Sequence, residues 1–551
     1  MKKIIKSINF EIISKMFIIL IGLVIFLSNI IFLLGGTISK FVFPASFCLS
    51  AFIVYLLYNK KVKLKDIIIN IGFSVIIFFI LLFISMLFFD NSWDGNVYHK
   101  EMIGLMKNGM NPIYNVLSGD IWTQHYANGT EVFSSVLYAF TNNIESGKVV
   151  NLLLSFSLFY YAYTFFKSCL KNKAFLIILS ISISLNPLLL NQFHTYYIDA
   201  VVANSLYLFI LSLLFFIKNN SKFDLKIGTL FLFSSIVVIN SKFTALLIWG
   251  LFLLVIGGYI LIMNIRKKDF KNVKKIIILA LVTSIISVAI CGSSTYVKNF
   301  IDHGHPFYPL MGEQAVDIET GNEPESFKNK SHTKKWLYAT FSKTYTWYNK
   351  SPELKIPFSI YESELESIKY PDIRIGGLGV WFSGILVLSV IGILSAGYFV
   401  FKKSLKSFIV SLLLICAIFL PIPKLPIVWQ ARYYPQIYLV SFIAIFMLLL
   451  ANKKAFKYFA YLIIVCTFIN SILLLPQAKE QYDSSRIINN QLVELSRLSL
   501  TENIVISQDN YTFYGTYYNY IDYNIKYKYS KQKLENAIPL YHGAFYKIIE
   551  E

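Results

Sequence analysis

Residues 16–34 read MFIILIGLVIFLSNIIFLL and contain no charged side chain. An α-helix needs about 20 apolar residues to cross the hydrocarbon core of a bilayer, so this stretch predicts a transmembrane helix. It is longer than the apolar core of a signal peptide, and no clear small-residue cleavage site follows it. We therefore expect this helix to be retained in the mature protein.

Similar apolar runs recur along the 551 residues. The chain is 56% hydrophobic and only 15% charged, whereas a soluble domain carries about 25% charged residues. The pattern predicts an all-α polytopic membrane protein with about 13 transmembrane helices. The predicted spans are 16–35, 41–58, 67–89, 148–167, 174–190, 198–217, 226–240, 243–263, 275–293, 378–400, 407–421, 436–451 and 457–475.

Positive charge marks every second connection between these spans, from Lys2 and Lys3 at the start to Lys453 and Lys454 before the last span. Basic loops stay in the cytoplasm. The alternation predicts an integral protein of a bacterial plasma membrane, with a cytoplasmic N-terminus and an extracytoplasmic C-terminus. The net charge of +20 is explained by these loops, so we expect membrane lipids and no nucleic acid as partners.

The apolar segment 226–263 is basic at both ends. As one helix it would reach about 57 Å, well beyond a hydrocarbon core of roughly 30 Å. We expect a hairpin that turns on the outer side at Asn240-Ser241-Lys242.

The long connections all fall on the predicted outer side. Residues 486–498 have helical spacing, and NIVIS at 503–507 is typical of a strand, so the tail predicts a small mixed α/β domain. The expected division is a transmembrane module over 1–475, with outer loops 90–147 and 294–377, and an extracytoplasmic domain over 476–551.

The first outer loop opens with SWDGNVYHKE (92–101). A helix is expected over 95–108, and its stripe of Tyr98, Met102 and Leu105 fits a helix that lies on the membrane surface. Asp94 is then either the N-cap of this helix or an acid with a chemical role.

Further charged residues stand at predicted outer span ends. Asp199 stands at the start of a span, where an acid costs free energy unless it forms an ion pair or has a functional role. Lys242 and Arg432 run against the positive-inside trend. They are either interfacial anchors or ligands of a phosphate, and acids that share their face favour the second interpretation. The histidines lack zinc spacing, and a divalent metal ion held by Asp94, His99 or Asp199 stays open.

Six short segments, read in order, resemble the GT-C membrane glycosyltransferases, in particular the bacterial branch similar to protein O-mannosyltransferases and to the aminoarabinose transferases of lipid A. The resemblance covers the chain to about residue 440. One departure is that Asp94 is followed by Gly95, where those families usually show an Asp-Glu pair, and this leaves the substrate class open. The segments are WDGNVYH, TYYIDA, SKFTAL, NFIDHGHPFYPL, IRIGGLG and ARYYPQ.

The resemblance implies transfer of a sugar from a polyprenyl-phosphate donor to a hydroxyl of a glycan, lipid or protein, with inversion, on the outer face and with no required cofactor. It implies that Asp94 is the general base and Asp199 a second acid that orients the acceptor or binds a metal. The implied donor-phosphate ligands are Lys242, Arg432 and Lys298. The implied substrate-binding residues are Tyr98, His99, His194, Tyr197, Asn299, His303, Tyr308 and Arg374.

Two other classes of protein stay open at this point. A lipid or sugar transporter or flippase would also be polytopic, but its charges should lie near the bilayer middle beside broken helices. An O-antigen ligase or polymerase would also carry a large outer loop, and arginine pairs rather than an early acid are expected there.

Overall fold

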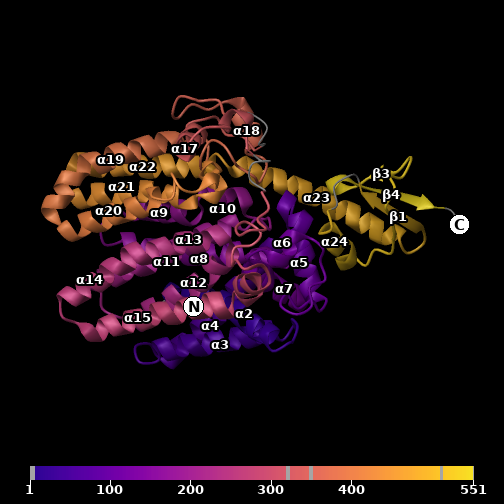
Figure 1. Cartoon of the computed structure of the whole chain (residues 1–551), viewed down its shortest axis with the longest axis horizontal. Helices are drawn as coiled ribbons and strands as arrows, with labels where there is room; N and C mark the ends of the chain where they lie inside the picture. The colour runs from indigo at the N-terminus through magenta and orange to yellow at the C-terminus, as the bar shows by residue number, and fades with distance from the viewer. Residues whose placement is uncertain (1–6, 318–322, 347–350, 509–512, 550–551) are drawn as a thin grey trace.

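The computed structural model describes residues 7–317, 323–346, 351–508 and 513–549. Long helices fill one side of the molecule, and a small unit of strands and helices that carries the C-terminus projects from the other (Figure 1).

Eight helical segments of the described chain are long and apolar enough to cross a membrane, and five shorter apolar helices accompany them. This confirms the prediction of a mostly helical chain with many candidate membrane spans. The eight are Phe10–Leu33 (α2), Leu64–Met86 (α4), Ile144–Phe166 (η2 and α8), Asp199–Lys218 (α11), Phe243–Arg266 (α13, η3 and α14), Phe270–Ile290 (α15 and η4), Phe382–Lys403 (α19) and Lys454–Leu498 (α22, Lys454–Ile472, and α23, Leu475–Leu498). The five are Val42–Tyr58 (α3), Lys173–Ser184 (α9), Leu225–Ser241 (α12), Leu405–Phe419 (α20) and Pro435–Ala451 (η10 and α21).

Burial separates the inner helices of the bundle from the outer ones. Every residue of α2 from Ile12 to Ile25 is buried. By contrast, α4 buries one face with small or polar residues such as Asn70 and Ser74, while Ile76 and Phe83 are exposed. Small residues let membrane helices approach closely, and an exposed apolar face suits contact with lipid.

The predicted break at Lys242 is confirmed. Lys242 is extended (φ −161°, ψ 142°) between α12 and α13. Trp249 Nε1 donates to Ser235 Oγ at 2.9 Å. Because these two residues stand seven positions to either side of Lys242, the two helices run back along each other as a hairpin.

Segment 90–147, predicted to be the first outer loop, is helical, as predicted, and its first helix ends before Gly109 (φ +102°). The expected position of its apolar stripe on the membrane surface is wrong: Met102 is buried in the main core and Leu105 packs against that core. The elements are η1 (Gly95–His99), α5 (Lys100–Lys107), α6 (Ile121–His125), α7 (Gly129–Thr141) and η2 (Ile144–Lys148), which leads into α8 (Val149–Phe166).

The C-terminal unit covers the other side of α5. A Cβ at Gly104 would lie 1.9 Å from Tyr518 Cε1, so the two elements meet where only glycine fits. Asp522 accepts hydrogen bonds from Tyr138 Oη and from the Ile144 backbone N–H, both at 2.6 Å. This contact from the C-terminal side explains why the helix is buried rather than lying on a membrane.

Short elements fill the remaining connections. They are α10 (Pro187–Gln192), η5 (Ser293–Val297), α16 (Lys298–His303), η7 (Glu325–Phe327), α17 (His332–Thr340), α18 (Glu362–Ser367), η8 (Pro426–Trp429), η9 (Ala431–Tyr433) and η10 (Pro435–Tyr438), the last followed by α21 (Leu439–Ala451).

The predicted mixed α/β tail is confirmed as a four-stranded sheet in the order β2-β1-β4-β3. β1 pairs in parallel with β2, and β4 is antiparallel to both β1 and β3. Ile488, Leu492 and Leu495 of α23 pack against the strand residues Ile504 and Ile506. The elements are β1 (Asn503–Gln508), α24 (Thr516–Asp522), β2 (Lys528–Ser530), β3 (Ile538–Pro539), η11 (Tyr541–Gly543) and β4 (Ala544–Ile549).

Candidate functional site

Charged side chains from five separate parts of the chain meet in one place, which we call the Asp94–Arg432 cluster. They come from the residue before η1, the start of α11, the turn between α12 and α13, the loop before α19, and η9. The members are Asp94, Asp199, Lys242, Asp372, Arg374 and Arg432.

Arg432 is the centre of the cluster. Its Nη1 lies 3.3 Å from Asp94 Oδ2 and 3.5 Å from Asp199 Oδ2. Its Nε lies 3.2 Å from Asp372 Oδ1. One guanidinium therefore bridges three carboxylates through two of its nitrogens, Nη1 and Nε, which arginine holds in one rigid plane.

Asp199 and Asp372 each contact a second cation. Lys242 Nζ lies 2.5 Å from Asp199 Oδ1, and Arg374 Nη2 lies 2.7 Å from Asp372 Oδ2. The backbone N–H of Ala431 donates to Arg374 O at 2.9 Å, which ties the two loops together. Three carboxylates face three cations, so the cluster is neutral when all six groups are ionised.

Aromatic faces enclose the cations. Lys242 Nζ lies 3.4 Å from the centroid of the Tyr433 ring, and Arg432 Cζ lies 4.7 Å from that of Tyr197. Burial raises the pKa of Tyr433 to about 12, so its hydroxyl is neutral at physiological pH. That hydroxyl accepts from Arg432 Nη2 at 3.0 Å and keeps its own proton to donate. Burial, followed by the nearby Asp94 carboxylate, raises the pKa of Tyr98 well above its ordinary value.

Exposure differs sharply across the cluster. The side chain of Asp94 is 19% exposed, whereas those of Asp199 and Arg432 are 2% and 4% exposed. Burial by itself would lower the pKa of Arg432, but the surrounding acids, Asp372 foremost, hold it well above its ordinary value. Arg432 is thus a permanent cation, and Asp94 is the most solvent-accessible member of the cluster.

The alternative role of Asp94 as a helix cap finds no support in the geometry. Its backbone is already helical (φ −58°, ψ −36°), and its side chain makes no capping hydrogen bond. The contact its carboxylate does make is with Arg432.

Four of the predicted site residues lie in a second group, centred on His125 of α6. Asn299 donates to the carbonyl oxygens of His125 and Tyr308 at 2.9 and 2.8 Å, and His303 stacks on Tyr308 with ring centroids 3.7 Å apart. Lys298 is paired with Asp302 at 2.5 Å. None of the described contacts of this group reaches the Asp94–Arg432 cluster.

The two remaining predicted histidines have local partners. His194 is buried and stacks on Phe88, with centroids 3.5 Å apart. His99 Nδ1 lies 2.5 Å from Glu131 Oε1, and both residues are buried. The structure therefore brings together Asp94, Asp199, Lys242 and Arg432 with Arg374, Tyr98 and Tyr197, and gives other neighbours to His99, His194, Lys298, Asn299, His303 and Tyr308.

Sequence reasoning missed Asp372, Tyr433 and Gln192. Gln192 Nε2 donates to Asp199 Oδ2 at 3.0 Å. Tyr433 follows Arg432 inside the segment ARYYPQ, and Asp372 immediately precedes the segment IRIGGLG. Within the described ranges, no group of three or more His, Cys, Asp or Glu side chains is placed to hold a metal ion.

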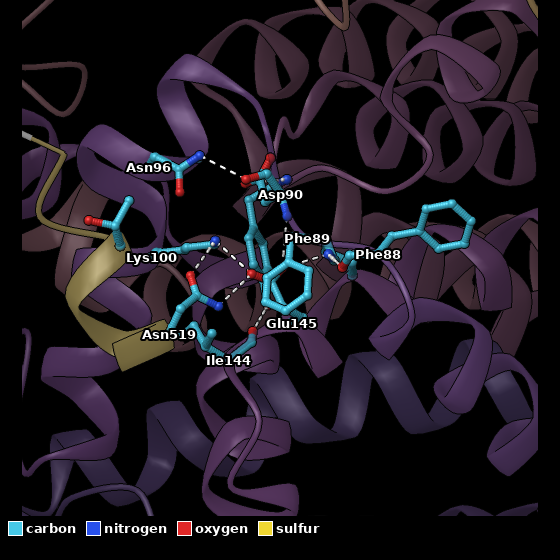
Figure 2. A network of polar contacts seen from close by, with 12 residues as sticks. Phe88, Phe89, Asp90, Asn96, Lys100, Ile144, Glu145 and Asn519 are labelled. Carbon is cyan, nitrogen blue, oxygen red and sulfur yellow. Dashed lines mark hydrogen bonds and ion pairs between the residues drawn. The ribbon is translucent and has the colours of Figure 1, made fainter. Parts of the chain in front are cut away.

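A buried polar network fixes the segment that carries Asp94 (Figure 2). Glu145 Oε1 lies 2.6 Å from Lys100 Nζ, and Glu145 Oε2 lies 2.5 Å from Lys148 Nζ. The Asp90 backbone N–H donates to Glu145 Oε2 at 3.1 Å. Asn519 of α24 donates to Glu145 Oε1 at 2.9 Å and accepts from Lys100 at 3.0 Å. The Glu145 carboxylate is thus bonded both by the C-terminal unit and by the loop that carries Asp94.

The close packing of this loop explains the Gly95 that follows Asp94. A Cβ at position 95 would lie 1.8 Å from Asp90 Oδ2 and 2.4 Å from Ser92 Oγ. Asp90 is held there by the backbone N–H groups of Ser92 and Tyr196, at 2.8 and 3.1 Å. A glutamate at position 95, as in the families this segment resembles, is therefore incompatible with the observed loop.

Comparison of the chain with models of protein families, with curated proteins and with solved structures finds no match.

Proposed function

We propose that this protein is a membrane glycosyltransferase that moves a sugar from a polyprenyl-phosphate carrier to an acceptor hydroxyl at the outer face of the membrane, with inversion at the anomeric carbon. The observation that supports this function is the Asp94–Arg432 cluster. It combines equal numbers of carboxylates and cations at the ends of apolar helices, and Asp94 is its most exposed side chain.

Asp94 suits the role of general base. It takes the proton of the acceptor hydroxyl while that oxygen forms its bond to the anomeric carbon. The bond between that carbon and the phosphate oxygen breaks, and the electron pair stays on the phosphate. Lys242 and Arg432 stabilise the charge that grows on this leaving group. The transfer balances without a cofactor.

Asp199 suits a positioning role rather than that of a base. It is almost fully buried and is engaged by Lys242, Arg432 and Gln192. A carboxylate so held has no free face for an acceptor, but it fixes the Lys242 ammonium and the Arg432 fork relative to each other. Its ionic contact of 3.5 Å with Arg432 is the longest in the cluster.

An apolar cavity of about 300 Å³ supports a lipid-linked donor, although none of the six cluster residues lines it. It begins at Phe243, the residue after Lys242, and is walled by Leu247, Leu310 and Ile427. An isoprenoid chain in this cavity would have its phosphate end beside Lys242.

The proposed topology has all 13 apolar helices crossing the bilayer, with the five shorter ones included. Basic loops then lie in the cytoplasm, and the cluster and the C-terminal unit lie outside. A site outside the plasma membrane has no access to cytosolic nucleotide sugars, which is why the donor is lipid-linked. The acceptor hydroxyl belongs to a glycan, lipid or protein of the cell envelope.

The test is transfer by purified protein in liposomes that contain radiolabelled polyprenyl-phosphate sugars. Wild type should release polyprenyl phosphate and form a new glycosidic bond, and nucleotide sugars should be inert. Asp94→Asn should lose about 10²–10⁴-fold in the rate of transfer, whereas Asp302→Asn, a matched change in an acid outside the cluster, should be as active as wild type. Movement of label across the bilayer without a new bond would identify a flippase and overturn the proposal.

A further inference from the structure

A large apolar cavity, of about 390 Å³, lies between two groups of helices far from the Asp94–Arg432 cluster. Its walls come from α8 and α11 in the first half of the chain and from α20 and α21 in the second half. Leucine, isoleucine, valine and phenylalanine side chains make up most of the lining. A cavity with such walls excludes water and favours a hydrocarbon chain.

One end of this cavity is basic. Lys218, the last residue of α11, and Lys406, in the first turn of α20, both line it, together with Ser168 and Ser407. Lys218 Nζ donates to Ser168 Oγ at 3.3 Å, and Lys406 Nζ donates to the Ile217 carbonyl at 2.7 Å. Among the residues that the structure describes, neither lysine has a carboxylate within ion-pair distance.

The depth of the cavity matches one leaflet of a bilayer. Along α11 it extends from Lys218 to Tyr207, a rise of about 16 Å at 1.5 Å per residue. Half of a hydrocarbon core of roughly 30 Å is nearly the same length. At the end away from the lysines, Tyr207 contributes only its ring, because its hydroxyl donates to the Pro435 carbonyl at 2.6 Å.

We propose that this cavity binds one anionic phospholipid of the surrounding bilayer. The phosphate lies between Lys218 and Lys406, and an acyl chain extends along α11 toward Tyr207. Basic pockets between membrane helices recognise acidic lipid head groups in this way. The lipid fills the seam between the two halves of the bundle, so it also contributes to their packing.

The site is separate from the proposed donor site. α11 rises about 29 Å from Asp199 at its start to Lys218 at its end, and these residues belong to the cluster and to the cavity respectively. The proposal therefore does not depend on glycosyl transfer, and it stands or fails on lipid binding alone.

The experiment measures lipid binding by native mass spectrometry of the detergent-purified full chain, titrated with phosphatidylglycerol or phosphatidylcholine. Wild type should retain one phosphatidylglycerol in preference to phosphatidylcholine. The variant Lys218→Met/Lys406→Met should bind phosphatidylglycerol about 10–100-fold more weakly, since each lysine near a lipid phosphate contributes about one kcal/mol or somewhat more.

Two further variants make the result decisive. Lys60→Met/Lys63→Met removes two exposed lysines that do not line the cavity and should bind like wild type. Leu214→Trp fills the apolar wall while keeping both cations, and should also lose the lipid. Equal binding of the two lipids, or loss only in the control pair, would overturn the proposal. So would displacement of phosphatidylglycerol by equimolar polyprenyl phosphate, which would assign the cavity to the carrier.

Discussion

Replacing Arg432 with alanine should weaken both the fold and the chemistry, and the two effects can be separated. The Arg432 side chain is buried and lies against three carboxylates. Its removal leaves those three acids with two cations in a buried place. Breaking a buried ion pair by removing one partner typically costs about 3–5 kcal/mol, so Arg432→Ala should unfold at a clearly lower temperature than wild type.

The loss of activity has a different origin. A charge-assisted hydrogen bond contributes about 1.5–3 kcal/mol, so kcat/KM should fall by roughly 10–100-fold in the folded fraction if Arg432 holds the leaving phosphate. Arg432→Lys keeps the charge but loses the fork, and should recover only part of that rate.

The double variant Arg432→Ala/Asp372→Asn separates the two roles. It removes one positive and one negative charge, so the cluster is neutral again and thermal stability should partly return. Activity should stay low, because the phosphate ligand is still missing. The control is Lys355→Met, which breaks a buried pair with Glu364 outside the cluster and should lower stability without changing kcat/KM.

The result that would refute this reasoning is specific. If the double variant regains activity in proportion to its stability, Arg432 is a scaffold for neighbouring carboxylates and the phosphate site lies elsewhere. Differential scanning fluorimetry in detergent and single-turnover transfer on the same preparations provide both measurements.

Three further outcomes are expected. Asp94→Asn should lose about 10²–10⁴-fold in the rate of transfer while its thermal unfolding stays near wild type, and parallel losses of both would remove it as the base. Gly95→Ala should destabilise the first outer loop through the clash with Asp90, seen as lower yield and faster hydrogen exchange there; normal yield and exchange would contradict the packing. Burial raises the pKa of Asp522 to about 6 from 3.8, so the docking of the C-terminal unit is strongest below pH 3.8 and weakens as the pH rises to about 6. Hydrogen exchange in α24 should follow that change, and Asp522→Asn should abolish it.

Much of the site was predictable because charge is costly near a membrane. Asp199, Lys242 and Arg432 each stood out against an apolar background, and that contrast alone marked them. Asp372 gave no such signal, since an acid in a polar loop is ordinary. Asp372 matters because its carboxylate contacts Arg432, 60 positions later in the chain. A single sequence gives no signal of such a long-range contact.

The other expected residues show the limit of the same reasoning. Lys298 and Asp302 stand four positions apart on α16 and neutralise each other. The His194 ring stacks on Phe88. A polar residue at the end of a span stands out because its burial costs free energy. That cost can be offset by a partner nearby in the sequence or by a distant one. The helices were predictable because their apolar length is a property of contiguous sequence, whereas the long-range pairing of loop residues is not.

The C-terminal unit contributes to the position of Asp94, although the described part of this unit makes no polar contact with the Asp94 carboxylate, which is paired with Arg432. Asn519 of α24 shares Glu145 with Lys100, which lies one turn and a half beyond Asp94 on the same helical stretch. The Gly515 backbone N–H donates to Asn96 O at 2.8 Å. A base must be held within a few tenths of an ångström of its substrate to work efficiently. Contacts from the C-terminal unit to both Asn96 and Lys100 hold the helical stretch that begins at Asp94, so the small domain helps to orient the proposed base rather than being an independent appendage.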